Sequence, residues 1–164
     1  MEERTVPRVS SGAQKLHVPM ALSPLTLSVD TRRLRAEHAV IADALADLCV
    51  VADALPDLGL AARTDLLQIA ASLGRRLNHH AQREEEELYP QLASLYGESK
   101  LVDALIHDHR AIGAAADELA CSDSFDDCPR VQARVYGLQL LVATHMDTEE
   151  QVVFPMFEPD GTSA

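Results

Sequence analysis

Six ionisable side chains stand at positions in this sequence where the surrounding pattern calls for apolar residues. Around them, leucine, isoleucine and valine recur every three or four residues, which is the spacing of the buried face of a helix. The six exceptions are four histidines and two glutamates: His38, His80, Glu84, His109, His145 and Glu149. Because a buried carboxylate without a partner costs several kcal/mol, we expect these glutamates to be paired or bound to a cation.

Two of the histidines precede a glutamate by four residues, as His80 precedes Glu84 and His145 precedes Glu149. Residues at this spacing share one face of a helix, so each pair can reach a common ion. Four imidazoles and two carboxylates form a ligand set that suits iron and could also hold manganese or zinc. If both carboxylates bridge two six-coordinate irons, positions remain for an oxide or hydroxide bridge and for dioxygen, peroxide or nitric oxide.

The chain repeats this pattern. An offset of 65 residues lays His80 on His145 and Glu84 on Glu149, and also aligns Leu88-Tyr89-Pro90 with Val153-Phe154-Pro155. A second offset, of 71 residues, pairs the two lone histidines, His38 and His109. The repeats predict two helical hairpins with equivalent polar positions.

Four apolar stripes with helical spacing must carry these residues. The first runs from Asp30 and is stopped by Pro56, and the second opens near Thr64-Asp65 and ends at Gly97, loosened on the way by Pro90. The third covers residues 102–119 and the fourth covers residues 131–152, ending at Pro155. Aromatic residues make up only 4% of the chain, which disfavours a sheet. We therefore predict an all-α, antiparallel up-down four-helix bundle.

Length and charge limit the other possibilities. At 164 residues the chain is sized for one domain, divided into an N-terminal arm over 1–28, the bundle over 29–158 and a tail over 159–164. Its net charge of −12 would repel nucleic acid and anionic membranes, so we expect neither as a partner. No basic start precedes an apolar segment, and no 18 apolar residues run together, so we expect a cytoplasmic protein.

The doubled HxxxE motif, with a lone histidine upstream of each copy and an apolar pair and proline after it, resembles the hemerythrin-like, HHE cation-binding family over about residues 30–157. The resemblance implies a four-helix bundle around a non-haem diiron centre bridged by two glutamates, and the count of positions above adds an oxide or hydroxide bridge. In it, the four histidines are terminal ligands and Glu84 and Glu149 are bridges. Oxygen-carrying hemerythrins have a fifth histidine four residues from the third-helix histidine, where this chain has Leu105 or Gly113.

The four-histidine set resembles family members that handle peroxide or nitric oxide or that sense iron. We therefore expect a diiron protein that handles or senses small oxidants or gases, as an enzyme or as a sensor. The alternative is an iron-binding module for sensing, storage or delivery without turnover. The expected partner is peroxide or a small diatomic molecule.

Several residues next to these six could have either of two roles. Glu37 and Asp108 each precede a lone histidine, and Glu87 lies close to the second stripe, so each could support a metal ligand or face solvent. Glu85 and Glu150 are most simply part of a solvated acidic face, although the 65-residue offset aligns them. Tyr89 and Phe154 are expected to pack at helix ends rather than contact a ligand.

Overall fold

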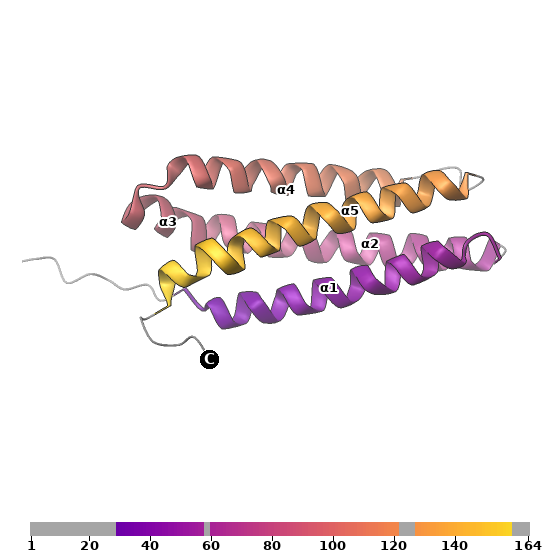
Figure 1. Ribbon diagram of the computed structural model, residues 1–164, viewed down its shortest axis with the longest axis horizontal. Helices are drawn as coiled ribbons and strands as arrows, with labels where there is room; N and C mark the ends of the chain where they lie inside the picture. Colours follow the sequence, from indigo (N-terminus) through magenta and orange to yellow (C-terminus); the bar gives the residue numbers. More distant parts are fainter. Residues whose placement is uncertain (1–28, 58–59, 122–126, 159–164) are drawn as a thin grey trace, which may run out of the picture.

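A computed structural model describes residues 29–57, 60–121 and 127–158 of the chain. Long helices dominate it: α1 (Thr31–Ala54), α2 (Leu60–Arg83), α4 (Ser99–Ala120) and α5 (Cys128–Thr148). Short turns extend two of them: η1 (Glu84–Leu88) and α3 (Tyr89–Tyr96) follow α2, and η2 (Glu149–Val153) and η3 (Phe154–Phe157) follow α5. The predicted all-α four-helix bundle is confirmed (Figure 1).

Local chemistry sets the helix ends. The Asp30 side chain accepts a hydrogen bond from the Arg33 N–H, and the Asp127 side chain accepts one from the Arg130 N–H, so an aspartate caps both α1 and α5. Gly97 closes α3 with φ at 68°, a left-handed conformation that glycine adopts without steric cost. One boundary differs from the sequence prediction: α2 begins at Leu60 rather than near Thr64. Residues 60–63 are Leu-Ala-Ala-Arg, all good helix formers, so the helix starts one turn earlier.

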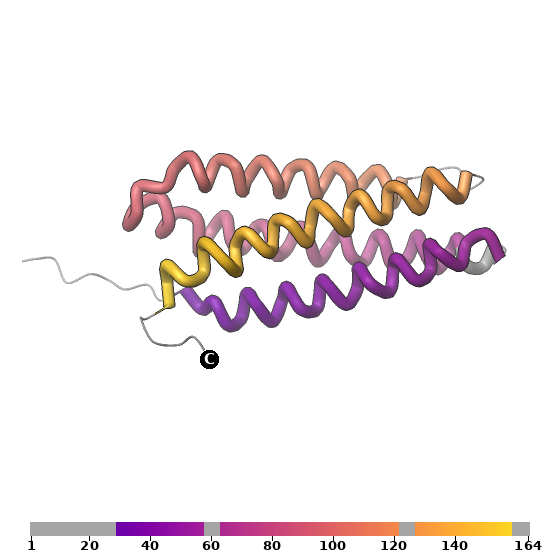
Figure 2. Tube along the Cα trace, in the orientation of Figure 1, coloured from indigo at the N-terminus to yellow at the C-terminus, as the bar shows by residue number. Residues whose placement is uncertain are grey.

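The four long helices form a ring in chain order, with α1 packed on α2, α2 on α4, α4 on α5 and α5 on α1. The tube in Figure 2 shows the chain entering α1 and leaving η3 at one end of the bundle, while α1 and α4 finish at the other end. Consecutive long helices therefore run antiparallel. The predicted arm over 1–28 and tail over 159–164 lie outside the described residues, so those domain limits stay predictions.

The six ionisable residues lie between two apolar clusters. The end cluster consists of Leu34, Leu88, Tyr89, Leu92, Leu105, Val153 and Phe154. The long core cluster fills the rest of the bundle and includes Ile41, Leu77, Ile112 and Val142. On each long helix, the ionisable positions fall between a member of one cluster and a member of the other. Water is thus excluded on both sides of them.

Two π-helical turns interrupt the regular helices, and each begins at a glutamate of the motif. The Tyr89 N–H bonds to the Glu84 carbonyl and the Phe154 N–H bonds to the Glu149 carbonyl, five residues back rather than four. Such a turn inserts an extra residue and shifts the face of everything after it. Both turns are followed by a proline in the first turn of the next helix, where its missing N–H is tolerated. Among the described residues, no helix is long and apolar enough to cross a membrane.

Candidate metal centre

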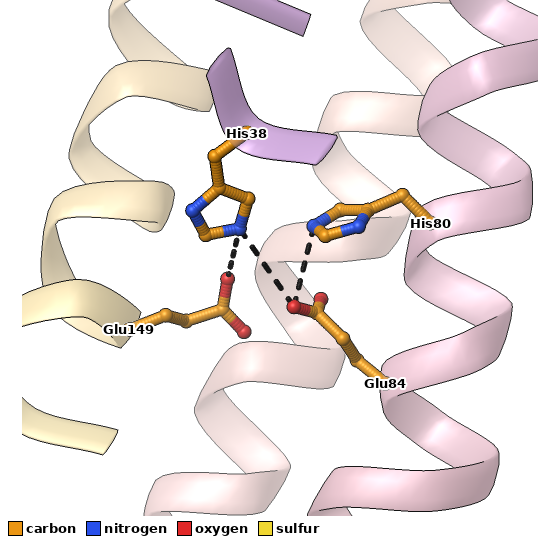
Figure 3. A group of neighbouring side chains, drawn as sticks. All are labelled: His38, His80, Glu84 and Glu149. Atoms are coloured by element: carbon orange, nitrogen blue, oxygen red, sulfur yellow. Dashed lines mark ion pairs between the residues drawn. The ribbon is translucent and has the colours of Figure 1, made fainter. Parts of the chain in front are cut away.

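All six ionisable residues predicted from the sequence converge inside the bundle. None is more than 9% exposed, and Glu84 and Glu149 are fully buried. Figure 3 shows His38 and His80 pointing toward the two carboxylates from different helices. His80 Nε2 lies 3.2 Å from Glu84 Oε1, and His38 Nε2 lies 3.4 Å from Glu149 Oε2 and 3.8 Å from Glu84 Oε1.

The other two histidines complete the arrangement from α4 and α5. His109 Nε2 lies 3.3 Å from Glu84 Oε2, and His145 Nε2 lies 3.3 Å from Glu149 Oε2. Potential ligand atoms within 4.8 Å of one another form two overlapping groups: His38, His80, Glu84 and Glu149, and Glu84, His109, His145 and Glu149. Both carboxylates belong to both groups. We call the first group the α1/α2 half and the second the α4/α5 half of the centre.

The inner nitrogen and oxygen atoms face one another without good hydrogen bonds. Among the described residues, His38 Nε2, His80 Nε2, His145 Nε2 and three carboxylate oxygens of Glu84 and Glu149 are buried with no hydrogen-bond partner. Such groups are costly to bury unsatisfied. Two ligands at right angles on one ion, each about 2.1 Å from it, lie about 3 Å apart. The observed separations of 3.2–3.4 Å fit shared coordination, so the residues present suit a pair of metal ions.

Each imidazole presents its other nitrogen to a second carboxylate. His38 Nδ1 lies 2.8 Å from Glu150 Oε1 and His109 Nδ1 lies 2.9 Å from Glu85 Oε1. The two remaining pairs are His80 Nδ1 with Glu37 Oε2 at 3.1 Å and His145 Nδ1 with Asp108 Oδ2 at the longer distance of 3.7 Å. In the three hydrogen-bonded pairs the carboxylate holds the proton on Nδ1, which leaves Nε2 free to bind a metal and fixes the ring orientation. His145 Nδ1 lies near Asp108 but is buried without a hydrogen-bond partner in the described part of the chain.

The structure brings two of the three predicted outer residues to imidazoles. Glu37 lies against His80 and Asp108 lies near His145, each across from a histidine of another helix. Glu87 is exposed and has no ion pair or hydrogen bond with a histidine of the centre among the described residues. Instead Glu85 and Glu150, read as a solvated face, contact His109 and His38. The alignment of Glu85 with Glu150 at the 65-residue offset was the sequence feature that could have indicated their role.

Tyr89 is the residue of the centre that sequence reasoning missed. Its hydroxyl donates a hydrogen bond to Glu149 Oε1 at 2.7 Å and lies 3.2 Å from His109 Nε2. The equivalent residue in the second repeat, Phe154, has no hydroxyl. Both rings stack on a histidine, Tyr89 on His109 at 5.5 Å and Phe154 on His38 at 5.3 Å between centroids. The two rings therefore occupy equivalent positions, and only Tyr89 adds a hydroxyl there.

Burial and nearby charges shift the pKa values of the histidines and glutamates of the centre in opposite directions. Burial lowers the pKa of His38, but the contacts with Glu149, Glu84 and Glu150 outweigh it and bring the pKa to about 10. Burial raises the pKa of Glu84, but the contacts with His109 and His38 and the charge of His80 bring it to about 2. Burial and the neighbouring carboxylates raise the pKa of Tyr89, so its hydroxyl stays a protonated donor. In His80 and His145 burial dominates and lowers the pKa.

A small cavity adjoins the histidines on the side of the long core cluster. It measures about 20 Å³ and is lined by His80, His109 and His145 together with apolar side chains that include Ile112 and Val142. This is room for about one water molecule. A ligand of that size fits in this cavity, and an organic substrate does not fit there.

One comparison with known proteins found a match. The family model described as hemerythrin HHE cation binding domain matches residues 29–160. No curated protein and no solved structure gave a significant match. The matched range begins just before α1 and contains all six residues of the centre.

Proposed function

Because the chain belongs to the hemerythrin HHE cation-binding domain family, we propose that it holds two iron ions at this centre and uses them to handle or sense peroxide, nitric oxide or dioxygen. The observation that carries the proposal is the pair of fully buried glutamates, whose oxygens face imidazole nitrogens from all four long helices at 3.2–3.8 Å. Oxygen and imidazole ligands in this number suit iron.

The residues have distinct roles in this proposal. Glu84 and Glu149 would contribute carboxylate ligands to both ions, and the four histidines would bind through Nε2, two in each half. Bound iron would supply Lewis acidity and one-electron redox chemistry toward small oxidants. Glu150, Glu37 and Glu85 fix three of the imidazoles through Nδ1. Tyr89 donates a hydrogen bond to Glu149 and holds that carboxylate in place. The cavity of about 20 Å³ limits access to molecules of about the size of water.

Metal analysis tests the iron assignment. After expression with added iron, the purified protein should contain close to two irons per chain and absorb in the near ultraviolet and visible. Glu84→Ala and Glu149→Ala should each lower the iron content, whereas Glu86→Ala, which alters an exposed glutamate, should not. Full occupancy by zinc or manganese under those conditions would contradict the assignment.

The loss of stability that the metal-free centre causes favours a second function. Without metal, inner nitrogen atoms of three histidines and three carboxylate oxygens are buried with no hydrogen-bond partner among the described residues, which costs stability, so metal binding and folding would be coupled. Such a protein could report iron by unfolding in its absence. Peroxide turnover separates the two functions: catalytic oxygen release supports the first, whereas a large iron-dependent rise in melting temperature without turnover supports the second.

A further inference from the structure

A groove of about 580 Å³ lies between α1 and α2, outside the small cavity already described. Its volume falls within the range of small-molecule sites in proteins. Its inner wall contains Glu37 and His80, so the groove borders the α1/α2 half of the centre. It is far larger than any ligand that the small cavity admits.

The groove is basic in an acidic protein. Arg33, Arg75 and Arg76 line it, against the single carboxylate of Glu37, although the chain as a whole carries a net charge of −12. Arg33 is paired with Glu37 at 3.3 Å. Arg75 and Arg76 are exposed, and neither has a carboxylate within 4.0 Å in the part of the chain that the structure describes.

Three lining residues from α1 are apolar, and Ser72, His79 and His80 complete the lining from α2. Val40 is 48% exposed and lies in the groove with Ala36 and the buried Ile41. Two arginines without carboxylate partners beside an exposed apolar floor match a ligand with an anionic group and an apolar body. A neutral apolar ligand would leave the guanidinium groups unused, and an inorganic anion would leave Val40 uncovered.

We propose that the α1/α2 groove binds a small organic anion, with its anionic group paired to Arg75 and Arg76 and its apolar body against Val40. The ligand then lies beside the Glu37–His80 hydrogen bond, next to the centre but without direct contact with the metal ions. This binding does not require the proposed redox function, because the residues that make it are not among the six of the centre.

The test uses a matched pair of probes and isothermal titration calorimetry on the full chain as purified. The anionic probe is 1-anilinonaphthalene-8-sulfonate, and N-phenyl-1-naphthylamine is the same molecule without its sulfonate. We expect one site for the sulfonate. The doubly substituted variant Arg75→Ala with Arg76→Ala should weaken it about tenfold, the combined effect of two partly exposed ion pairs. The neutral probe should bind more weakly, and the same substitutions should not affect it.

Two control variants separate the groove from general charge and surface effects. Arg130→Ala with Arg134→Ala removes the same charge from α5, outside the groove, and should leave sulfonate binding unchanged. Val40→Glu should abolish it, whereas Val50→Glu, at a valine on the same helix that is 68% exposed and outside the groove, should not. Equal sulfonate affinity in the unmodified chain and in the Arg75/Arg76 variant, or equal affinity for both probes, would overturn the proposal. Circular dichroism checks that each variant remains helical.

Discussion

Removing the Tyr89 hydroxyl is the most informative single change at the centre. Tyr89→Phe keeps the ring that stacks on His109 and removes only the donor to Glu149 Oε1. Tyr89 is 1% exposed and Glu149 is fully buried, so water cannot replace the lost bond. Glu149 Oε2 already lacks a hydrogen-bond partner. The variant therefore leaves a buried carboxylate with neither oxygen satisfied.

A hydrogen bond to a charged group contributes about 1.5–3 kcal/mol, and the larger part of that range applies when the partner stays buried. We expect the metal-free variant to lose about 2 kcal/mol of unfolding free energy. For a protein of this length, that corresponds to a fall in melting temperature of about 4–8 °C. Thermal unfolding followed by circular dichroism, with a chelator present, measures it.

Tyr136→Phe is the matched control, because Tyr136 also donates to a carboxylate, Asp53 at 2.6 Å, but is 43% exposed. There water replaces the lost partner, and the expected cost is below about 1 kcal/mol. If Tyr89→Phe costs no more than Tyr136→Phe, the Tyr89 hydroxyl does not satisfy the buried carboxylate and the reasoning fails.

Three further predictions concern the surroundings of the ligands. Glu85→Gln should weaken iron binding about 10–100-fold in a chelator competition, whereas Glu87→Gln should match the unmodified chain; equal effects would show that the outer carboxylate does not act on His109. Gly113→Leu should fill the small cavity and lower azide affinity at least tenfold, measured by visible titration, with iron content unchanged; unchanged azide binding would place the ligand elsewhere. In the metal-free protein, the raised pKa of His38 stabilises the fold fully below its ordinary value of 6.5, and this effect is lost toward about 10. The lowered pKa of Glu84 stabilises it fully above 4.5, and this effect is lost toward about 2. The lowered pKa values of His80 and His145 act on the acid side, because they cost stability as the pH falls below 6.5. Urea unfolding should accordingly find greatest stability near about pH 6.5, and a maximum above pH 8 would contradict these shifts.

The six central residues could be predicted because they break a pattern that burial enforces. A leucine stripe identifies the inward face of each helix, and an ionisable residue such as Glu84 on that face must be buried wherever the helix packs. The fold follows from the same stripes, since short connections between amphipathic helices favour antiparallel neighbours. Neither inference needs any knowledge of side-chain geometry.

The residues around the centre could not be predicted in this way, because the helix changes its period at the glutamates. A regular α-helix would place Glu87 near the inward stripe and Tyr89 off it. The π turn at Glu84–Leu88 adds a residue, so Glu87 becomes exposed and Tyr89 is buried over Glu84. The role of Glu85 and Glu150 was missed for another reason. A carboxylate on a helix surface is expected to face solvent unless the neighbouring helix is known to place an imidazole beside it.

Because the chain repeats itself, a difference between the two halves of the centre can be traced to particular residues. The repeats supply each half with two histidines and place a carboxylate near the outer nitrogen of every imidazole, so the two halves of the protein scaffold are nearly alike. Tyr89 breaks that equivalence, because its hydroxyl contacts His109 and Glu149 while Phe154 offers only a ring to His38. The Tyr89 hydroxyl therefore lies against the α4/α5 half. The α1/α2 half has an apolar ring at the equivalent position and borders the basic groove. The two halves of the centre therefore offer different surroundings, with a hydroxyl donor in the α4/α5 half and an apolar ring in the α1/α2 half.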